Sequence, residues 1–423
     1  MIFFRNLLLC TSVTCIFCFN ACKKDEDSLT LAKELELYVE VDSSTNQFIL
    51  TWPLISAQNF EYYRIFVERE SDGNIEILTE INDYYQQEFI VDNLFFEKIT
   101  FYIELVNGSS PSKYANVKIT PPNVQTVFTG FPQHVMLDSV NNNVILCLYN
   151  DTTVVYDYNK DKIISKRRIY DIDAATLNYT ANNPELLICD YDIGRYSPLT
   201  LNRTDLFASS YYNTYDITTT NRFVFFFFFG YIYVYGKNGD RLDNRYVYAE
   251  GKMSTLNDST ILLLDDINYY NKELMLYQFS DNELTQTKYN GYYENRNWSG
   301  KSKVDYKNQQ ICMLPYGEVF GFDLSYKGQI SSELLQDVYI NNNGYVYVAP
   351  VNKKEIVVYD KLLGTNSVKT IKTPGYITHI LKYKEQLICV LTNRALNMDT
   401  YDNSYNEYSR NTPFVIHVVD LNK

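Results

Sequence analysis

The stretch Val144-Ile-Leu-Cys-Leu-Tyr-Asn-Asp-Thr-Thr-Val-Val-Tyr-Asp157 decides the fold. It consists of a very apolar segment, a polar turn, and a second apolar segment that ends in an aromatic residue and an aspartate. Short β-branched and aromatic runs separated by Asn and Asp are typical of antiparallel strands joined by tight turns. The stretch therefore predicts two paired strands rather than a helix.

The same strand–turn–strand pattern returns along residues 123–423. Seven repeats of roughly 35–50 residues predict a propeller of seven four-stranded blades. The five consecutive phenylalanines at 225–229 are too few to cross a membrane and fill a strand position of the third repeat. The apolar strands are predicted at residues 144–149, 186–190, 223–229, 261–264, 311–314, 345–348 and 387–391, and their partners at 154–157, 196–201, 231–235, 274–279, 319–323, 356–360 and 414–420.

This repeat resembles that of YVTN-type bacterial β-propellers, whose units carry a similar strand–turn–strand-Asp pattern. No Trp-Asp signature is present, so the eukaryotic WD40 type is not indicated. Val124-Gln-Thr-Val127 resembles Val368-Lys-Thr-Ile371, the predicted outer strand of the sixth blade. Since few residues follow Asp420, we expect residues 123–130 to supply the outer strand of the seventh blade and to close the ring.

Seven short strands with alternating polar and apolar residues are predicted within residues 31–120, which indicates a β-sandwich. Ile49-Leu-Thr-Trp52 and Tyr63-Arg-Ile65 resemble the second and third strands of a fibronectin type III domain. Phe101 stands where that family usually has its corner tyrosine. Pro121-Pro122 predicts a short, stiff linker. The expected fold is all-β: a fibronectin type III-like β-sandwich followed by a seven-bladed β-propeller with N-terminal strand closure.

Residues 1–21 resemble a lipoprotein signal peptide. A basic residue precedes the apolar run Leu7–Phe19, and an alanine followed by Cys22 resembles the lipobox of bacterial lipoproteins. The resemblance implies that Cys22 carries palmitate-type acyl chains and that residues 22–30 form a tether. The charged run Lys23–Asp27 resembles the surface-export signal of Bacteroidota-type outer-membrane lipoproteins. An ordinary secretory signal or a signal anchor is the alternative interpretation.

Composition narrows the range of partners and cofactors. Asp and Glu number 51 against 38 Lys and Arg, giving a net charge of −13, so no nucleic-acid partner is expected. Neither a CxxC motif nor a His/Cys cluster is present, so neither a metal nor another cofactor is expected. Free buried thiols rather than disulfides are expected at four comparable positions in the repeats. These are Cys147, Cys189, Cys312 and Cys389.

Long insertions are predicted at one face of the blades. Loops between second and third strands emerge on the same face as the connections between blades, and such loops commonly carry binding residues. The insertions are residues 265–272, 290–300 and 392–412, with a smaller one at 190–195. Their aromatic rings suit stacking on sugars or anchoring a protein, although tyrosine, with 40 residues, also covers sheet surfaces generally. The candidate ligand-binding residues are Tyr269, Tyr270, Tyr292, Tyr293, Trp298, Arg394, Tyr401 and Tyr405.

The sequence contains no GxSxG, HExxH or P-loop motif. Asp190 with Asp192, and Asp265 with Asp266, are candidate carboxylate pairs for glycosidic chemistry, but they lie at predicted turns, where Asp is favoured anyway. We therefore expect no enzyme. The three histidines are expected to be ordinary residues of separate repeats: His134, His379 and His417.

The expected function is that of a non-catalytic binding module on an outer-membrane lipoprotein that faces the cell exterior. Its expected partners are the membrane, through the lipid on Cys22, and an extracellular glycan held on the loop-rich face. The alternative is a protein–protein scaffold or adhesion lipoprotein of the envelope; a polysaccharide-active enzyme is less favoured. In layout the chain resembles accessory lipoproteins of glycan-capture systems, with an anchor, a sandwich as spacer and a binding domain.

Overall fold

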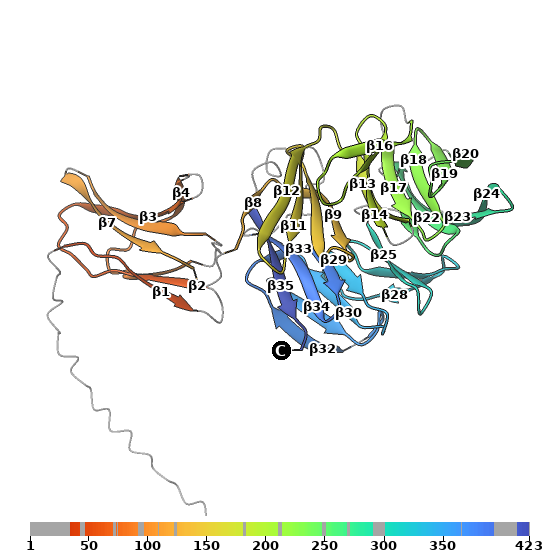
Figure 1. Cartoon of the computed structure of the whole chain (residues 1–423). Coiled ribbons are helices and arrows are strands. Elements are labelled where there is room, and N and C mark those ends of the chain that lie inside the picture. The colour runs from red at the N-terminus through yellow and green to blue at the C-terminus, as the bar shows by residue number, and fades with distance from the viewer. Residues whose placement is uncertain are drawn as a thin grey trace, which may run out of the picture. The chain divides into compact units, whose positions relative to one another are not determined.

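In the computed structural model, the described part of the chain is built from β-strands. The structure describes residues 34–42, 47–70, 73, 75–91, 97–108, 110–121, 125–180, 183–209, 214–247, 251–268, 271–290, 301–364, 366–392 and 413–422. These residues contain no helix, and therefore none long and apolar enough to cross a membrane. The chain divides into two compact units, whose main boundary lies between Ile119 and Thr120 (Figure 1). The predicted all-β class is confirmed.

The first unit contains a three-stranded and a four-stranded sheet. The strand order in the first sheet is β1 (Tyr38–Asp42), β2 (Gln47–Thr51) and β5 (Glu88–Val91). In the second sheet it is β4 (Ile75–Ile81), β3 (Phe60–Arg69), β6 (Ile99–Asn107) and β7 (Ser110–Ile119). Tyr63, Ile65 and Val67 of β3 are fully buried because alternate side chains of a strand point to the same face of its sheet.

Aromatic residues fill the core of the first unit. Trp52 packs against Tyr63 with ring centroids 5.5 Å apart, and Phe48 packs against Phe101 at 5.4 Å. All four side chains are buried. Phe101 thus serves as a core residue, a role for which it needs no hydroxyl group.

The second unit contains seven four-stranded antiparallel sheets (Figure 1). The first sheet is β9 (Pro132–Asp138), β10 (Asn143–Leu148), β11 (Thr152–Asp157) and β12 (Lys162–Arg168). The second is β13 (Ala174–Thr180), β14 (Asn183–Cys189), β15 (Ile193–Tyr196) and β16 (Arg203–Ala208). The third is β17 (Thr214–Thr219), β18 (Phe223–Phe228), β19 (Tyr231–Gly236) and β20 (Arg241–Tyr246).

The remaining sheets continue this order along the chain. The fourth is β21 (Gly251–Thr255), β22 (Thr260–Asn268), β23 (Asn271–Ser280) and β24 (Glu283–Asn290). The fifth is β25 (Ser302–Asp305), β26 (Gln310–Met313), β27 (Glu318–Gly321) and β28 (Tyr326–Gln329). The sixth is β29 (Leu335–Ile340), β30 (Val346–Pro350), β31 (Glu355–Tyr359) and β32 (Ser367–Lys372). The seventh is β33 (Tyr376–Tyr383), β34 (Gln386–Thr392), β35 (Pro413–Asp420) and β8 (Phe128–Thr129).

The apolar runs of the repeat form the second strands of the sheets. Every residue of β10 is buried, and in β18 all residues but Phe223 are buried. A strand that is covered on both faces has no polar face, which explains why these runs do not alternate. The four expected thiols lie in second strands and are buried and free, as predicted: Cys147, Cys189, Cys312 and Cys389.

The aspartates that end many strands stabilise the turns that follow. In the first sheet, a carboxylate oxygen of Asp138 accepts the backbone N–H groups of Val140 and Asn141. Asp157 does the same for Asn159 and Lys160 after β11. An aspartate that satisfies backbone donors in this way favours a tight turn over a continued strand.

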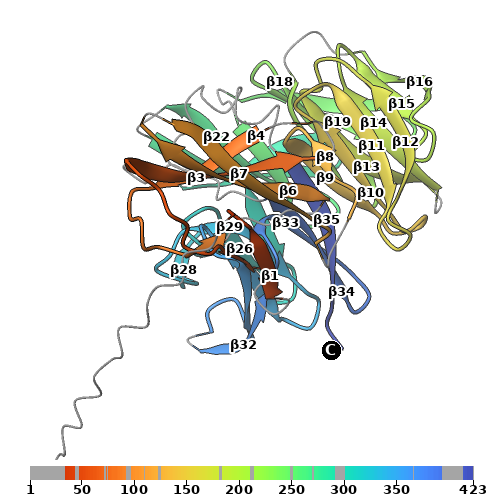
Figure 2. The same cartoon turned by 90° about the vertical axis from the view of Figure 1, so that its left-hand side faces the viewer.

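Seven apolar clusters join consecutive sheets of the second unit. Six of them each link one sheet to the next, from the first and second sheets to the sixth and seventh. Figure 2 shows the neighbouring first and second sheets in gold and yellow-green. The last cluster contains Phe128 and Phe414 of the seventh sheet together with Val144 and Tyr156 of the first. The core therefore runs from the first sheet to the seventh and returns to the first.

The seventh sheet combines both ends of the second unit. Phe128 and Thr129 of β8 pair with Phe414 and Pro413 of β35. Phe128 is buried and stacks on Phe414 with centroids 5.1 Å apart. The paired residues lie later in the chain than Val124–Val127, on which the predicted resemblance was based.

Two predicted loops differ from the structure. Residues 193–195 are not a loop, because β15 spans Ile193–Tyr196 and pairs with Leu186–Cys189; the predicted strand 196–201 is mostly a turn. Pro198 has no N–H to donate to a ladder, and the backbone of Leu201 bonds back to Ser197 at 2.9 Å. At residues 265–272 the ladder of β22 and β23 extends to the pair Asn268 and Asn271, where an insertion loop was predicted.

Candidate functional site

The sequence-predicted site residues all lie outside the described residues. This holds for the lipidation candidate Cys22 and for the ligand-binding candidates Tyr269, Tyr270, Tyr292, Tyr293, Trp298, Arg394, Tyr401 and Tyr405. Their flanking strands are described: β22 and β23 flank the first pair, β24 ends at Asn290, and β34 ends at Thr392. These strand ends define the side of the sheets from which the predicted loops depart.

Each sheet of the second unit has two ends. We call the end at which the first strands begin the entry end, and the end at which they finish the exit end. Antiparallel order places the second-to-third-strand turns and the connections between sheets at the entry end. The first-to-second-strand and third-to-fourth-strand turns lie at the exit end. The predicted ligand loops therefore belong to the entry end.

Charged and imidazole side chains gather on the first strands near the entry end. Six consecutive first-strand regions around the ring of sheets contribute them, with the second sheet contributing none. Each side chain lies within electrostatic range of at least one other member. We call this set the inner cluster: His134, Asp216, Lys252, Lys301, Lys303, Asp337 and His379.

The two carboxylates of the inner cluster hold neighbouring first strands together. Asp216 accepts the backbone N–H of Met253 at 2.6 Å, and Asp337 accepts that of Ile380 at 2.7 Å. The other oxygen of Asp337 forms an ion pair with Lys303 Nζ at 2.8 Å. Burial raises the pKa of Asp216, while Lys252 and two backbone donors oppose that rise. Both carboxylates therefore link the first strands of neighbouring sheets.

The two histidines of the inner cluster are neutral at pH 7. Burial first, and then the charges of Lys252 and Lys301, lower the pKa of His134 to about 4. Burial also lowers the pKa of His379 well below its usual value, and Lys301 and Lys303 add to the effect. Nδ1 of His379 lies 3.1 Å from the hydroxyl of Thr378. Neutral imidazoles beside ammonium groups can serve as hydrogen-bond partners without adding charge.

Among the lysines of the inner cluster, Lys301 has the least compensation of its charge by neighbouring groups. Burial lowers its pKa, Lys303 adds to the lowering, and Asp337 opposes it. Within the described ranges, its side chain forms neither a hydrogen bond nor an ion pair. Enclosing a charge without a close counter-ion is costly. The inner cluster contains three lysines against two carboxylates, so its composition suits an anionic group at the entry end.

Two of the sequence predictions about catalysis and metals can be compared with the described residues. Among the described residues no three His, Cys, Asp or Glu side chains are grouped so as to hold a metal ion. Asp190, one of the candidate catalytic carboxylates, accepts the hydroxyl of Tyr196 at 2.9 Å and so has a structural partner. His134, His379 and His417 lie in β9, β33 and β35, as strand residues.

Sequence reasoning missed the inner cluster. Its members are separated by up to 245 residues, from His134 to His379, and each lies in a short strand or, for Lys301, directly before one. The available signal was the equivalent placement of polar residues near the start of successive first strands. That signal is weak until the sheets are arranged around one another.

Comparisons with known proteins identify no family. No family model and no curated protein matches the chain. Among solved structures, the crystal structure of the computationally designed protein Ika8 aligns with a TM-score of 0.44 and 8% sequence identity, covering 69% of this chain and 98% of that one. A similarity at this level carries no argument about function, which therefore depends on the residues of this chain.

Proposed function

We propose that the second unit is a seven-bladed β-propeller closed by β8, and that the first is a fibronectin type III-like sandwich. Seven four-stranded antiparallel sheets joined in a cycle by apolar clusters support the propeller. Two sheets with three and four strands, around a buried Trp52, support the sandwich. Such a propeller presents two polar ends on a rigid frame, which suits it to binding.

The protein in this proposal is a lipid-anchored lipoprotein of the bacterial outer membrane that faces the exterior. The support comes from the sequence: the apolar run Leu7–Phe19, the lipobox-like Ala21-Cys22, and the charged residues 23–27. The sandwich acts as a spacer between the anchor and the propeller.

The propeller in this proposal binds a ligand at its entry end without catalysis. The observation that carries this proposal is the placement of Lys252, Lys301 and Lys303 together with only two carboxylates in the inner cluster, at the end from which the predicted loops depart. An acidic group of the ligand, such as a uronic acid carboxylate of a glycan, would compensate that charge. The aromatic and Arg residues of the predicted loops would contact the rest of the ligand.

Replacing Lys301 by methionine tests this function. We expect the detergent-extracted full protein to bind a galacturonic acid hexamer. Lys301→Met should weaken that binding at least tenfold, because the ammonium group is lost while most of the volume of the side chain is kept. Lys166→Met, at an exposed position of β12, is the matched control and should leave the dissociation constant unchanged. Calorimetric titration provides the measurement.

The same variants distinguish the alternative of a protein scaffold. If no acidic glycan binds, but Lys301→Met abolishes capture of one envelope protein that Lys166→Met still captures, the ligand is a protein and the glycan proposal fails. If both variants behave like the unmodified protein in both assays, the entry end is not the binding site.

A further inference from the structure

A groove of about 820 Å³ lies at the exit end, opposite to the predicted loops. First strands and the turns that follow them, from four successive sheets, the second to the fifth, line it. Its volume is in the range of pockets that hold small molecules. The lining side chains used below are Tyr179, Thr219, Asn221, Asp258 and Tyr306.

Two tyrosine rings at this groove are held in place by their hydroxyl groups. Tyr306 donates to the backbone oxygen of Thr255 at 2.9 Å, and Tyr179 donates to that of Leu137 at 3.3 Å. Both bonds cross from one sheet to its neighbour. The two residues nevertheless remain 57% and 37% exposed. A ring that is fixed at its hydroxyl and open on its face is a preorganised surface for stacking.

The floor of the groove is rigid. Thr219 donates to the backbone oxygen of Leu177 at 2.9 Å, and Thr220 donates to that of Asp258 at 3.0 Å, so the second, third and fourth sheets are tied together there. These bonds engage turn atoms and leave the side chains of Asn221 and Asp258 without a hydrogen bond to any other described residue. Both side chains are exposed.

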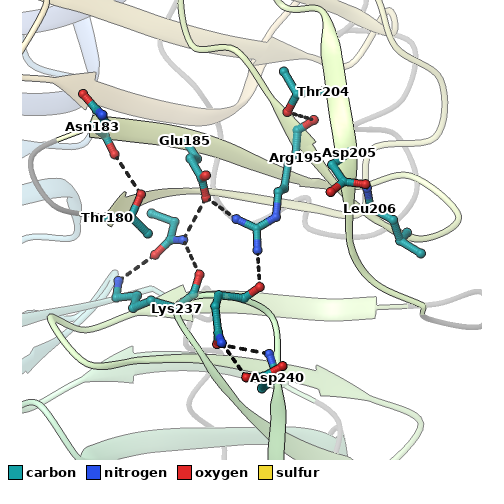
Figure 3. A network of polar contacts seen from close by, with 11 residues as sticks. Thr180, Asn183, Glu185, Arg195, Thr204, Asp205, Leu206, Lys237 and Asp240 are labelled. Carbon is teal, nitrogen blue, oxygen red and sulfur yellow. Dashed lines mark hydrogen bonds and ion pairs between the residues drawn. The ribbon is translucent and has the colours of Figure 1, made fainter.

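A partly buried polar network lies around Asn178, Glu185, Arg195 and Lys237, next to the strand that carries Tyr179 (Figure 3). Asn178, between two groove-lining residues, accepts from Lys237 Nζ at 2.7 Å. Glu185 accepts from Arg195 at 2.6 Å and from Asn178 at 3.3 Å. Burial lowers the pKa of Lys237 to about 8, opposed by the charges of Glu185 and Asp258. The network connects the second and third sheets and fixes the strand that carries Tyr179.

Tyr306 also borders a second cavity. This cavity, of about 270 Å³, is lined by turns of the fifth and sixth sheets and includes Asn341 and Asn342. Tyr306 thus stands between two polar cavities that follow one another around the exit end. A ligand that fills both has to be longer than a single ring.

We propose that these two cavities form a second binding site, for a neutral oligosaccharide of several sugar units. The apolar faces of sugar rings would stack on Tyr306 and Tyr179, and sugar hydroxyls would bond the free amide of Asn221 and the carboxylate of Asp258. A protein partner fits less well, because apart from Tyr179 and Tyr306 the accessible lining consists of Thr, Asn, Asp and Ser side chains, which offer few of the apolar contacts of an interface core. An acidic glycan fits poorly as well, because Asp258 would repel it. This site is independent of the function proposed for the entry end.

Calorimetric titration of the full protein in detergent with cellohexaose, xylohexaose, mannohexaose and maltohexaose tests this site. We expect at least one of them to bind, and Tyr306→Ala to weaken that binding at least tenfold because the stacking face is lost. Asn221→Ala should weaken it several-fold. Tyr326→Ala, an exposed tyrosine on the outer strand of the same sheet, should leave the affinity unchanged.

Further variants test the exit-end site if Tyr306→Ala proves unstable or binds its ligand weakly. Tyr306→Phe keeps the ring but removes its inter-sheet bond, so it should bind with an affinity between those of the unmodified protein and the Asn221→Ala variant. The proposal is overturned if none of the four hexasaccharides binds at millimolar concentration, or if Asn221→Ala and both Tyr306 variants bind like the unmodified protein. Lys301→Met should not affect this binding, so failure of one site is distinguishable from failure of the other.

Discussion

At the scale of single residues, His134 is expected to couple the stability of the protein to pH. His134 faces Lys252, Lys301 and the backbone of Asp173, and its pKa is lowered from 6.5 to about 4. Between these two values the unfolded chain binds a proton that the folded chain does not. The contribution of His134 to stability is therefore complete above about pH 6.5 and is lost as the pH falls towards 4.

We expect His134→Gln to lose less stability than the unmodified protein when the pH is lowered from 7 to 5. The lowered pKa of His134 corresponds to about 1–2 kcal/mol at pH 5. Urea unfolding at both pH values measures the difference. The contribution of the carboxylates to the pH dependence of stability cancels, because both proteins contain them. Equal losses in the two proteins would mean that His134 is not enclosed as described.

At the scale of elements, the two-residue strand β8 contributes strongly to the packing between the seventh and first sheets. Phe128 stacks on Phe414 and meets Tyr156 edge-on, each with centroids 5.1 Å apart. We expect Phe128→Ala to lower the free energy of unfolding by about 3 kcal/mol, because it leaves a cavity between the seventh and first sheets. Phe229→Ala, at a position 60% exposed, should change it by less than about 0.5 kcal/mol. Thermal and urea unfolding provide the measurements.

Truncation tests the same strand by another route. A chain that begins at residue 123 keeps β8, whereas one that begins at residue 131 lacks it and leaves the backbone of Pro413–Phe414 without its partner. We expect the shorter chain to melt at a markedly lower temperature or to aggregate. Similar melting temperatures for both chains would show that pairing with β8 contributes little.

Elements differ in how far the sequence predicts them, and the reason is burial. The second strands are predictable because both faces are covered, so runs such as Phe223–Phe228 are apolar throughout. The third strand of the second sheet was misplaced because Ile193–Tyr196 is short and contains glycine and arginine. The inner cluster and the exit-end groove were not predictable, because each is assembled from turns or strand starts of several sheets.

At the scale of the whole molecule, the proposed attachment to the membrane would depend on Cys22, which lies outside the described residues. Stable anchoring of a lipoprotein requires several acyl chains, since one chain binds membranes only marginally. We therefore expect Cys22→Ala to yield protein that is either soluble or unprocessed, as measured by membrane fractionation and signal cleavage. Processed Cys22→Ala protein that still sediments with membranes would contradict the lipoprotein proposal.

The pairing of β8 with β35 has a consequence for biogenesis. Residue 128 leaves the ribosome, and crosses any export channel, about 290 residues before its partner at position 414. The last interface to form is thus the one between the earliest and the latest parts of the second unit, and until then a row of backbone groups and the apolar side of the first sheet stay uncovered. A chain that stalls during synthesis just before residue 413 would have all its other sheets and still lack closure, so it would be a natural substrate for chaperones and proteases.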